Sequence, residues 1–520
     1  MIAPLLLVAP ACKSMDVSFE RQRLLDSASG GVAHAAPVRA VAGAEDYAHI
    51  EENTSKRVAD DPLSTFSIDV DTASYSNVRR FLAGGQLPPV DAVRIEEMIN
   101  YFNYAYPEPA AGEPFAVHTE VAACPWNARA KLARIGVKGR AIAHAAMPPR
   151  SLVFLLDVSG SMMDADKLPL LKRSLALLVA DLRPQDRVAI VVYAGASGVV
   201  LPPTAGDERD VIRGALEQLE AGGSTNGGAG IELAYALAQQ SFRDGGINRV
   251  ILATDGDFNV GTTSQGALER LIVQKRQSGI FLSVLGFGTG NLKDSTMEAL
   301  ADKGNGNYAY IDSLYEARKV LVEQAGGTLV TIAKDVKIQV EFNPARVGAY
   351  RLIGYENRML AHSDFNNDSK DAGEIGAGHT VTALYEVLAP GDTGGAATVD
   401  PLKYQRPTAP TGAAATDELM TVKLRFKPPQ GDTSQLVSVP IADGAQAFDG
   451  ASADLRFAAA VALFGMKLRG STHAASVSYP QLRALAAAAL GPDPNGYRSG
   501  LLALVDQAGT LATGGMQVAR

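Results

Sequence analysis

Carboxylate and hydroxyl side chains gather in three short segments of the sequence. Asp157, Ser159 and Ser161 lie within five residues, directly after an apolar run. Thr225 lies in a stretch rich in Gly and Ser, and Asp255 lies in the sequence Thr-Asp-Gly after a second apolar run. Oxygen ligands without sulfur or imidazole select a hard cation, and Mg²⁺ is a cation of this kind that keeps several of its waters. The three segments therefore predict a Mg²⁺ site, which Mn²⁺ or Ca²⁺ would also suit.

The elements that must position these side chains alternate between strands and helices. Apolar runs typical of buried parallel strands are 151–157, 187–195, 248–256, 281–288 and 307–312. Stretches that predict helices are 168–182, 209–220, 229–242, 264–278, 294–303 and 313–325. This alternation predicts an α/β fold with a doubly wound, mostly parallel sheet. Ligand sites in such sheets lie beyond the carboxyl ends of the strands, which is where Asp157 and Asp255 fall.

The three segments follow one another in an order and spacing that resemble the metal-ion-dependent adhesion site (MIDAS) of the von Willebrand factor A (VWA) domain. That site is written as Asp-x-Ser-x-Ser, then a Thr, then an Asp within Thr-Asp-Gly. The resemblance implies a Rossmann-like VWA fold in which Ser159 and Ser161 bind the metal directly. Thr225 would bind it directly or through a water, and Asp157 and Asp255 would act largely through waters.

A metal held mostly by neutral hydroxyls keeps residual positive charge and an open position. Such a site suits a carboxylate from another molecule, so the expected partner is a protein with an exposed Asp or Glu. The alternative reading is structural, because Asp and Ser at strand ends also cap the helices that follow. Asp257 and Asn259 lie at the same rim. They are expected to be loop residues or to contact the metal ligands without binding the metal themselves.

The segments on either side of the α/β region have other patterns. Residues 61–149 predict an α+β accessory domain, and 328–450 alternates apolar and polar residues as a β-sandwich does. Motifs such as TFSIDVDTASYSNVRRFL and GYENR resemble a bacterial lipoprotein-like family, in which a VWA domain lies between an N-terminal associated domain and a C-terminal domain of unknown function. The predicted division is 1–12 signal and lipobox, 13–60 flexible linker, 61–149 accessory domain, 150–327 VWA domain, 328–450 β-rich part and 451–520 helical part of the C-terminal domain.

The apolar stretch MIAPLLLVAPA at the start of the sequence runs directly into Cys12. It resembles the end of a bacterial lipoprotein signal, in which the cysteine becomes the first mature residue and carries the lipid. The resemblance implies lipidation of Cys12, a membrane anchor and a periplasmic or surface-exposed location in the cell envelope. The alternative is an apolar N-terminal stretch without fixed structure.

The composition excludes several other classes of protein. With 48 Lys and Arg against 56 Asp and Glu, the net charge is −8, which gives no electrostatic basis for binding nucleic acid. Two cysteines exclude a disulfide scaffold and a cysteine-only zinc site. The sequence lacks a Gly-x-Ser-x-Gly elbow, a Walker lysine motif and a His-Glu-x-x-His motif, so we expect that the protein is not an enzyme.

Residues 364–375 match a calcium-binding loop only in part. Oxygen-bearing side chains occupy positions one, three and five, but Ser369 and Ile375 stand where such a loop has Gly and Glu. We expect a solvated turn there.

Two hypotheses for function follow. The first is a lipid-tethered binding protein of the bacterial cell envelope, which captures a partner carboxylate through Mg²⁺ at the MIDAS. The second is an intracellular VWA scaffold that engages an ATPase or a cofactor-insertion complex through the same site. Lipid on Cys12 distinguishes the first hypothesis from the second.

Overall fold

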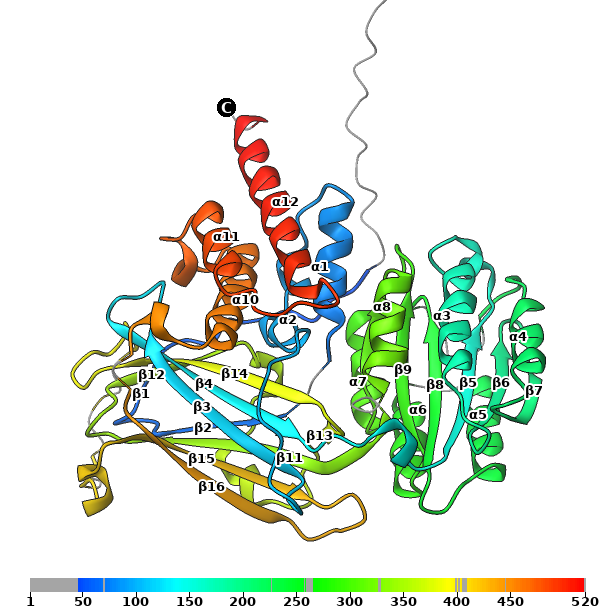
Figure 1. Cartoon of the computed structure of the whole chain (residues 1–520), viewed down its shortest axis with the longest axis horizontal. Coiled ribbons are helices and arrows are strands. Elements are labelled where there is room, and N and C mark those ends of the chain that lie inside the picture. The colour runs from blue at the N-terminus through cyan, green and yellow to red at the C-terminus, as the bar shows by residue number, and fades with distance from the viewer. Residues whose placement is uncertain are drawn as a thin grey trace, which may run out of the picture. The chain divides into compact units, whose positions relative to one another are not determined.

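The molecule is described by a computed structural model (Figure 1). The described residues are 45–68, 71–225, 227–256, 258, 265–325, 329–397, 400, 403–404, 409–444 and 446–518. The predictions for Cys12, Asp257 and Asn259 lie outside these residues.

Residues 150–323, here called the α/β part, contain a six-stranded sheet with helices on both faces (Figure 1). The strands, in their order across the sheet, are β10 (Tyr308–Ile311), β9 (Phe281–Phe287), β8 (Ile247–Thr254), β5 (Arg150–Asp157), β6 (Arg187–Tyr193) and β7 (Ser197–Ala205). All neighbours are parallel except β7, which runs antiparallel to β6. The predicted doubly wound, mostly parallel sheet is confirmed, and β7 is an edge strand that the sequence pattern did not indicate.

The helices of the α/β part cover the sheet with apolar stripes. One face packs against α3 (Leu168–Ala180), α4 (Arg209–Glu217), α8 (Leu314–Arg318) and the π-helical turn η4 (Lys319–Glu323). The other packs against α5 (Gly227–Gln240), α6 (Gln265–Gln277) and α7 (Asp294–Lys303). Leu171, Leu175 and Leu178 are buried at helical spacing along α3, as the sequence predicts. The helix expected over 313–325 is divided between α8 and η4.

Two antiparallel sheets, here called the sandwich, enclose a second core. One sheet has the order β1 (Lys56–Arg57), β12 (Ala349–Ile353), β14 (Thr380–Leu388), β4 (Ala130–Gly139) and β3 (Phe115–Ala123). The other has the order β13 (Gly373–Gly376), β11 (Thr331–Phe342), β15 (Glu418–Lys427) and β16 (Gln435–Ala442), with β2 (Leu63–Ser67) paired to β11. Both sheets therefore contain strands from 61–149 and from 328–450, and these two segments fold together around one core.

Five helices share a third core with the outer face of the first sandwich sheet. They are α1 (Ala73–Ala83), α2 (Ile95–Asn100), α10 (Ala453–Arg469), α11 (Tyr479–Ala487) and α12 (Tyr497–Val518). The predicted helical part at the C-terminal end is therefore present. Ser452 caps α10 by accepting a hydrogen bond from the Leu455 amide, and Gly470 ends that helix in the left-handed conformation.

Residues 45–60 differ from the linker expected over 13–60. The Asp46 amide donates to the Leu292 carbonyl at 2.9 Å, and β1 pairs with β12. Because these backbone groups are bonded to the rest of the described chain, residues 45–60 are part of the fold. Within the described residues, no helix combines the length and the hydrophobicity that crossing a membrane requires.

Buried charges join the α/β part to helices α1 and α2. Arg79 donates to Glu316 at 2.7 Å. The Lys319 ammonium donates to the Tyr101 carbonyl at 2.6 Å and lies 3.0 Å from the centre of the Tyr101 ring. Lys319 is only 1% exposed, and this burial lowers the pKa of its amine to about 7, although Glu316 opposes the shift.

The lowered pKa of Lys319 predicts a specific pH dependence of stability. Between about pH 7 and 10.5 the unfolded chain binds a proton at this amine that the folded chain lacks, so Lys319 makes the free energy of unfolding rise with pH. Lys319→Met removes this contribution, which is limited to ~1.4 kcal/mol per pH unit. Urea denaturation of both proteins at pH 7, 8 and 9 should show a smaller increase for the variant. Exposed Lys370→Met is the control, and equal increases in wild type and Lys319→Met would contradict the assignment.

Candidate metal centre

Asp157 ends β5 and holds three strand ends together. Its side chain is 0% exposed. Oδ1 accepts the Ser159 amide at 2.9 Å, and Oδ2 accepts the hydroxyls of Tyr193 and Thr254, each at 3.1 Å. Tyr193 ends β6 and Thr254 ends β8, so the carboxylate joins the loops after three parallel strands. Because protein donors occupy both oxygens, Asp157 is suited to supply charge and to position the loop, which agrees with an indirect role.

The two serine hydroxyls converge directly after Asp157. Ser159 is the N-terminal cap residue of the short 3₁₀ helix η3 (Gly160–Met163), and its backbone is extended. The turn brings the Oγ atoms of Ser159 and Ser161 to 3.1 Å from each other. Two neutral oxygens thus lie side by side at the carboxyl edge of the sheet, as a hard cation requires of its direct ligands.

The loop that carries Thr225 is bonded through its backbone to residues 158–161, here called the serine loop. The Gly222 amide donates to the Val158 carbonyl at 2.7 Å, and the Gly160 amide donates to the Gly223 carbonyl at 3.0 Å. Thr225 follows two residues later and is partly exposed. The structure therefore brings the second predicted segment against the first.

Asp255 follows β8 and contacts Lys167, a residue that is not part of the predicted site. The Lys167 Nζ donates to Asp255 Oδ2 at 2.9 Å, and Lys167 is only 4% exposed. A Cβ atom at Gly288 would lie 2.3 Å from Lys167 Cγ, so a glycine there makes room for the lysine stem. Gly256 has φ +107°, and a Cβ atom on it would lie 2.5 Å from the Lys293 amide nitrogen, which restricts the residue after Asp255 to glycine.

The electrostatics of the site favour an additional cation. Burial raises the pKa of the Asp157 carboxyl, the nearby Asp255 raises it further, and hydrogen bonds from Ser159 oppose the shift. Asp255 Oδ1 is buried and has no hydrogen-bond partner in the described part of the chain. A divalent ion would satisfy this oxygen and stabilise both carboxylates in their charged form. The donor set of carboxylates and hydroxyls therefore fits Mg²⁺.

Other candidate metal sites receive no support. Across the described ranges, no group of three or more His, Cys, Asp or Glu side chains could hold a metal ion. In the partial calcium loop, the ammonium groups of Lys337 and Lys427 contact the carbonyl oxygens of Asn367 (2.5 Å) and Asp368 (2.7 Å). Because lysines bind these carbonyls, the loop is unsuited to a calcium ion.

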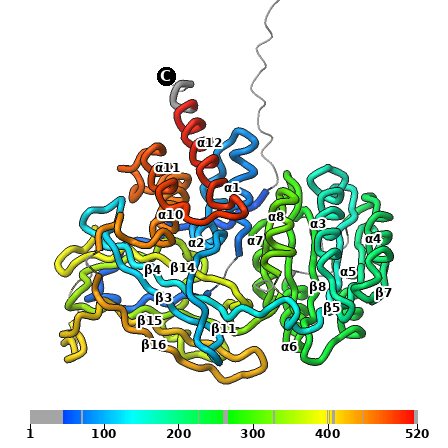
Figure 2. Tube along the Cα trace, viewed as in Figure 1, coloured from blue at the N-terminus to red at the C-terminus, as the bar shows by residue number. Residues whose placement is uncertain are grey.

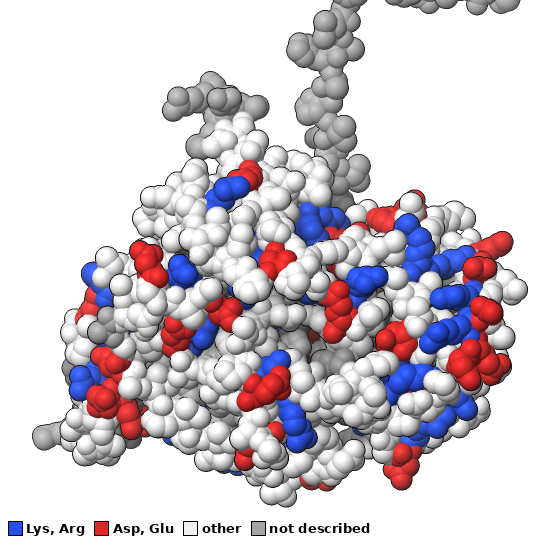
Figure 3. Space-filling view, viewed as in Figure 1, with Lys and Arg blue, Asp and Glu red and all other residues white. Residues whose placement is uncertain are grey.

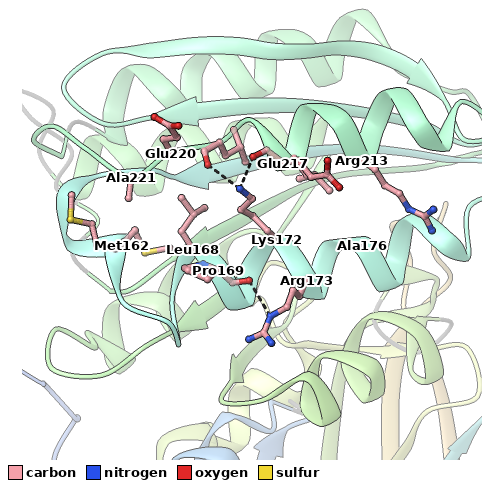
Figure 4. Close-up of a pocket in the computed structure, with 13 residues that line it drawn as sticks. Met162, Leu168, Pro169, Lys172, Arg173, Ala176, Arg213, Glu217, Glu220 and Ala221 are labelled. Carbon is pink, nitrogen blue, oxygen red and sulfur yellow. Dashed lines mark hydrogen bonds between the residues drawn. The ribbon is translucent and has the colours of Figure 1, made fainter.

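A groove of about 670 Å³ lies between α3 and α4, next to the serine loop (Figure 4). Met163 at the end of η3 is 66% exposed, and Ala221 just before the Thr225 loop lines the same end of the groove. Lys172 lies across its wall and donates to the carbonyls of Glu217 (2.7 Å) and Leu219 (3.1 Å). The groove therefore ends beside the loops that carry Ser161 and Thr225, although neither residue lines it.

The fold and the site define a protein that contains a VWA domain. Residues 151–324 match the family described as "von Willebrand factor type A domain", and residues 41–134 match the one described as "von Willebrand factor". Domains of this class commonly bind a divalent metal at the MIDAS. Over 148 residues, the chain is 27% identical to "Inter-alpha-trypsin inhibitor heavy chain H4" of Homo sapiens. This match covers 27% of this chain and 16% of that protein.

The chain belongs to the YfbK family. It is 46% identical over 473 residues to "Uncharacterized protein YfbK" of Escherichia coli (strain K12), which covers 90% of this chain and 81% of that protein. Residues 327–511 match the family described as "Uncharacterized protein YfbK, C-terminal".

The matches to solved structures are at low similarity. "von Willebrand factor type A from Catenulispora acidiphila" has a TM-score of 0.40 and 17% identity, over 64% of this chain and 74% of that one. The "ArnB paralog VWA2 from Sulfolobus acidocaldarius" has a TM-score of 0.37 and 15% identity, over 77% and 98%. Likeness at this level carries no information about function.

The contact between Lys167 and Asp255 predicts how the site's affinity for cations is set. Lys167→Met removes a positive charge 2.9 Å from Asp255, so Mn²⁺ should bind about tenfold more tightly, equivalent to ~1.4 kcal/mol. Titration followed by Mn²⁺ electron paramagnetic resonance measures this change. Lys172→Met is the matched control, because that ammonium contacts backbone carbonyls instead of carboxylates. Unchanged or weaker binding to Lys167→Met would show that the lysine does not oppose the metal.

Proposed function

We propose that this protein is a metal-dependent protein-binding protein of the bacterial cell envelope, with no enzymatic activity of its own. It would capture a partner's Asp or Glu through Mg²⁺ at the candidate metal centre. The observation that carries the proposal is the convergence of the Ser159 and Ser161 hydroxyls at the strand edge that also buries Asp157 and Asp255. Residues of this kind at this edge are suited to an ion that retains an open position.

Each residue has a distinct part in holding the ion. Ser159 and Ser161 would provide direct hydroxyl ligands, and Thr225 would bind directly or through a water. Asp157 and Asp255 would supply negative charge, largely through waters, while Lys167 limits the charge on Asp255. When bound, the ion supplies a positive charge and an open position for a partner carboxylate.

The surface around the site supports a protein partner. Residues of the partner on either side of its carboxylate would lie along the groove between α3 and α4, where Met163 is exposed (Figure 4). On the face shown in Figure 3, basic and acidic side chains are interspersed instead of forming one basic area. With the net charge of −8, this distribution favours a protein over a nucleic acid as the partner.

Removal of the predicted ligands should abolish metal binding and leave the fold largely intact. In Asp157→Ala/Ser159→Ala, one buried charge and one hydroxyl ligand are lost, so Mn²⁺ affinity should fall at least 100-fold in equilibrium titration, equivalent to ~2.8 kcal/mol. Circular dichroism checks the fold. Asp210→Ala, which removes an exposed carboxylate on α4, is the control. Mn²⁺ or Mg²⁺ binding that is unchanged in the double variant would refute the site, and EDTA should weaken capture of proteins from an envelope extract by the wild type.

A lipid anchor at Cys12 is the part of the proposal that concerns location. Metabolic labelling with a palmitate analogue should mark the wild type in the membrane fraction, because a lipobox cysteine carries the lipid. Cys12→Ala should lose the label, whereas Cys124→Ala should keep it, since Cys124 is buried within the fold. An unlabelled, entirely cytosolic wild type would contradict the envelope location and favour the intracellular scaffold.

A further inference from the structure

We propose that a cleft at the amino edge of the α/β sheet binds a small organic oxyanion, a carboxylate or a phosphate, through Arg249. The cleft has a volume of about 700 Å³ and lies between the α/β part and the sandwich. Thr331, Lys334 and Asp335 of β11 form part of the cleft wall, and Figure 2 shows where β11 lies in the fold. The candidate metal centre is at the carboxyl edge of the same sheet, so the two sites are separate.

Arg249 is a buried cation without a paired carboxylate. It is 2% exposed and lines the cleft at the start of β8. Nη1 donates to the Ser283 hydroxyl at 2.6 Å, and Nη2 reaches the Leu329 carbonyl only at 3.4 Å. Nε is buried with no hydrogen-bond partner, and no described carboxylate forms an ion pair with this guanidinium. A buried charge in this state is costly, and an anion held in the cleft close to this guanidinium would offset the cost.

The charge balance of the cleft leaves room for one anion. The ion pairs along its walls are Arg276–Asp371, Lys427–Asp335 (2.6 Å) and Lys334–Asp432 (3.6 Å). Those pairs occupy three of the carboxylates, and the fourth, Asp244, is exposed. Arg243 also lines the cleft and forms no ion pair with a described residue. Two guanidinium groups are therefore available to an incoming anion.

The class of ligand follows from these donors and from the volume. A guanidinium is planar and matches the geometry of carboxylate and phosphate oxygens. Burial lowers the pKa of Arg249 to about 10, opposed only by the charge of Glu374, which agrees with a cation that lacks a close counter-ion. A cleft of about 700 Å³ holds far more than one phosphate ion, so the oxyanion would be part of a larger organic molecule.

Calorimetric titration of the full chain with citrate and with inorganic phosphate tests the proposal. The protein is freed of metal on a chelating resin, so that the metal centre does not contribute, and a constant ionic strength excludes general screening. We expect saturable binding of at least one anion to wild type, at least tenfold weaker binding to Arg249→Met, and unchanged binding to Arg173→Met, an exposed arginine outside the cleft. Preference for citrate or for phosphate identifies the oxyanion. No saturable binding to wild type, or equal binding to Arg249→Met, would overturn the proposal.

A second measurement keeps the test valid if Arg249→Met does not fold. In wild type, the anion should slow hydrogen exchange at residues 243–249 and 329–335, which line the cleft. Protection confined to other regions would overturn the assignment. Asp157→Ala/Ser159→Ala should bind the anion as wild type does, so failure of this proposal is distinguishable from failure of the metal centre.

Discussion

Two carboxylates, Asp157 and Asp255, are buried near each other at the carboxyl edge of one sheet, and the structure of the site depends on how their charge is balanced. An unpaired buried carboxylate is costly, so each must find donors or a cation. Asp157 receives three hydrogen bonds from its own loop and from two neighbouring strands. Asp255 receives the Lys167 ammonium at one oxygen and leaves the other without a described partner. The remaining negative charge is what a divalent ion would neutralise.

The rest of the fold holds this edge in place. Backbone hydrogen bonds join the serine loop to the Thr225 loop, and glycines allow the tight turns around Asp255 and Lys167. The last helix of the α/β part is in turn joined to α1 and α2 through Glu316 and Lys319. These buried contacts hold the last helix of the α/β part against α1 and α2.

The sequence predicts the α/β part well, because its strands are buried on both faces and appear as continuous apolar runs. The runs 151–157 and 281–288 differ from β5 and β9 by one residue at one end, and α7 has the predicted bounds. The edge strand β7 was missed because only two of its nine residues are buried and it contains no such run. The serine loop could be predicted because its residues are adjacent in sequence.

Features that depend on distant residues could not be predicted in this way. Lys167 and Asp255 are far apart in the chain and meet only because the sheet brings their loops together. β4 and β14 come from segments before and after the α/β part in the sequence, yet they pair within one sheet. The sequence pattern therefore assigned these two strands to different domains. Arg249 occurs in an apolar run that predicts a strand, but nothing in that run shows that its charge is unpaired.

The most direct test of the metal centre is anomalous diffraction from crystals of the full chain grown with Mn²⁺. We expect a manganese peak within bonding distance of the Ser159 and Ser161 hydroxyls, with Asp157 and Asp255 reached through waters. No peak at this position, with the two hydroxyls still hydrogen-bonded to each other and Lys167 as the cation at Asp255, would contradict this expectation.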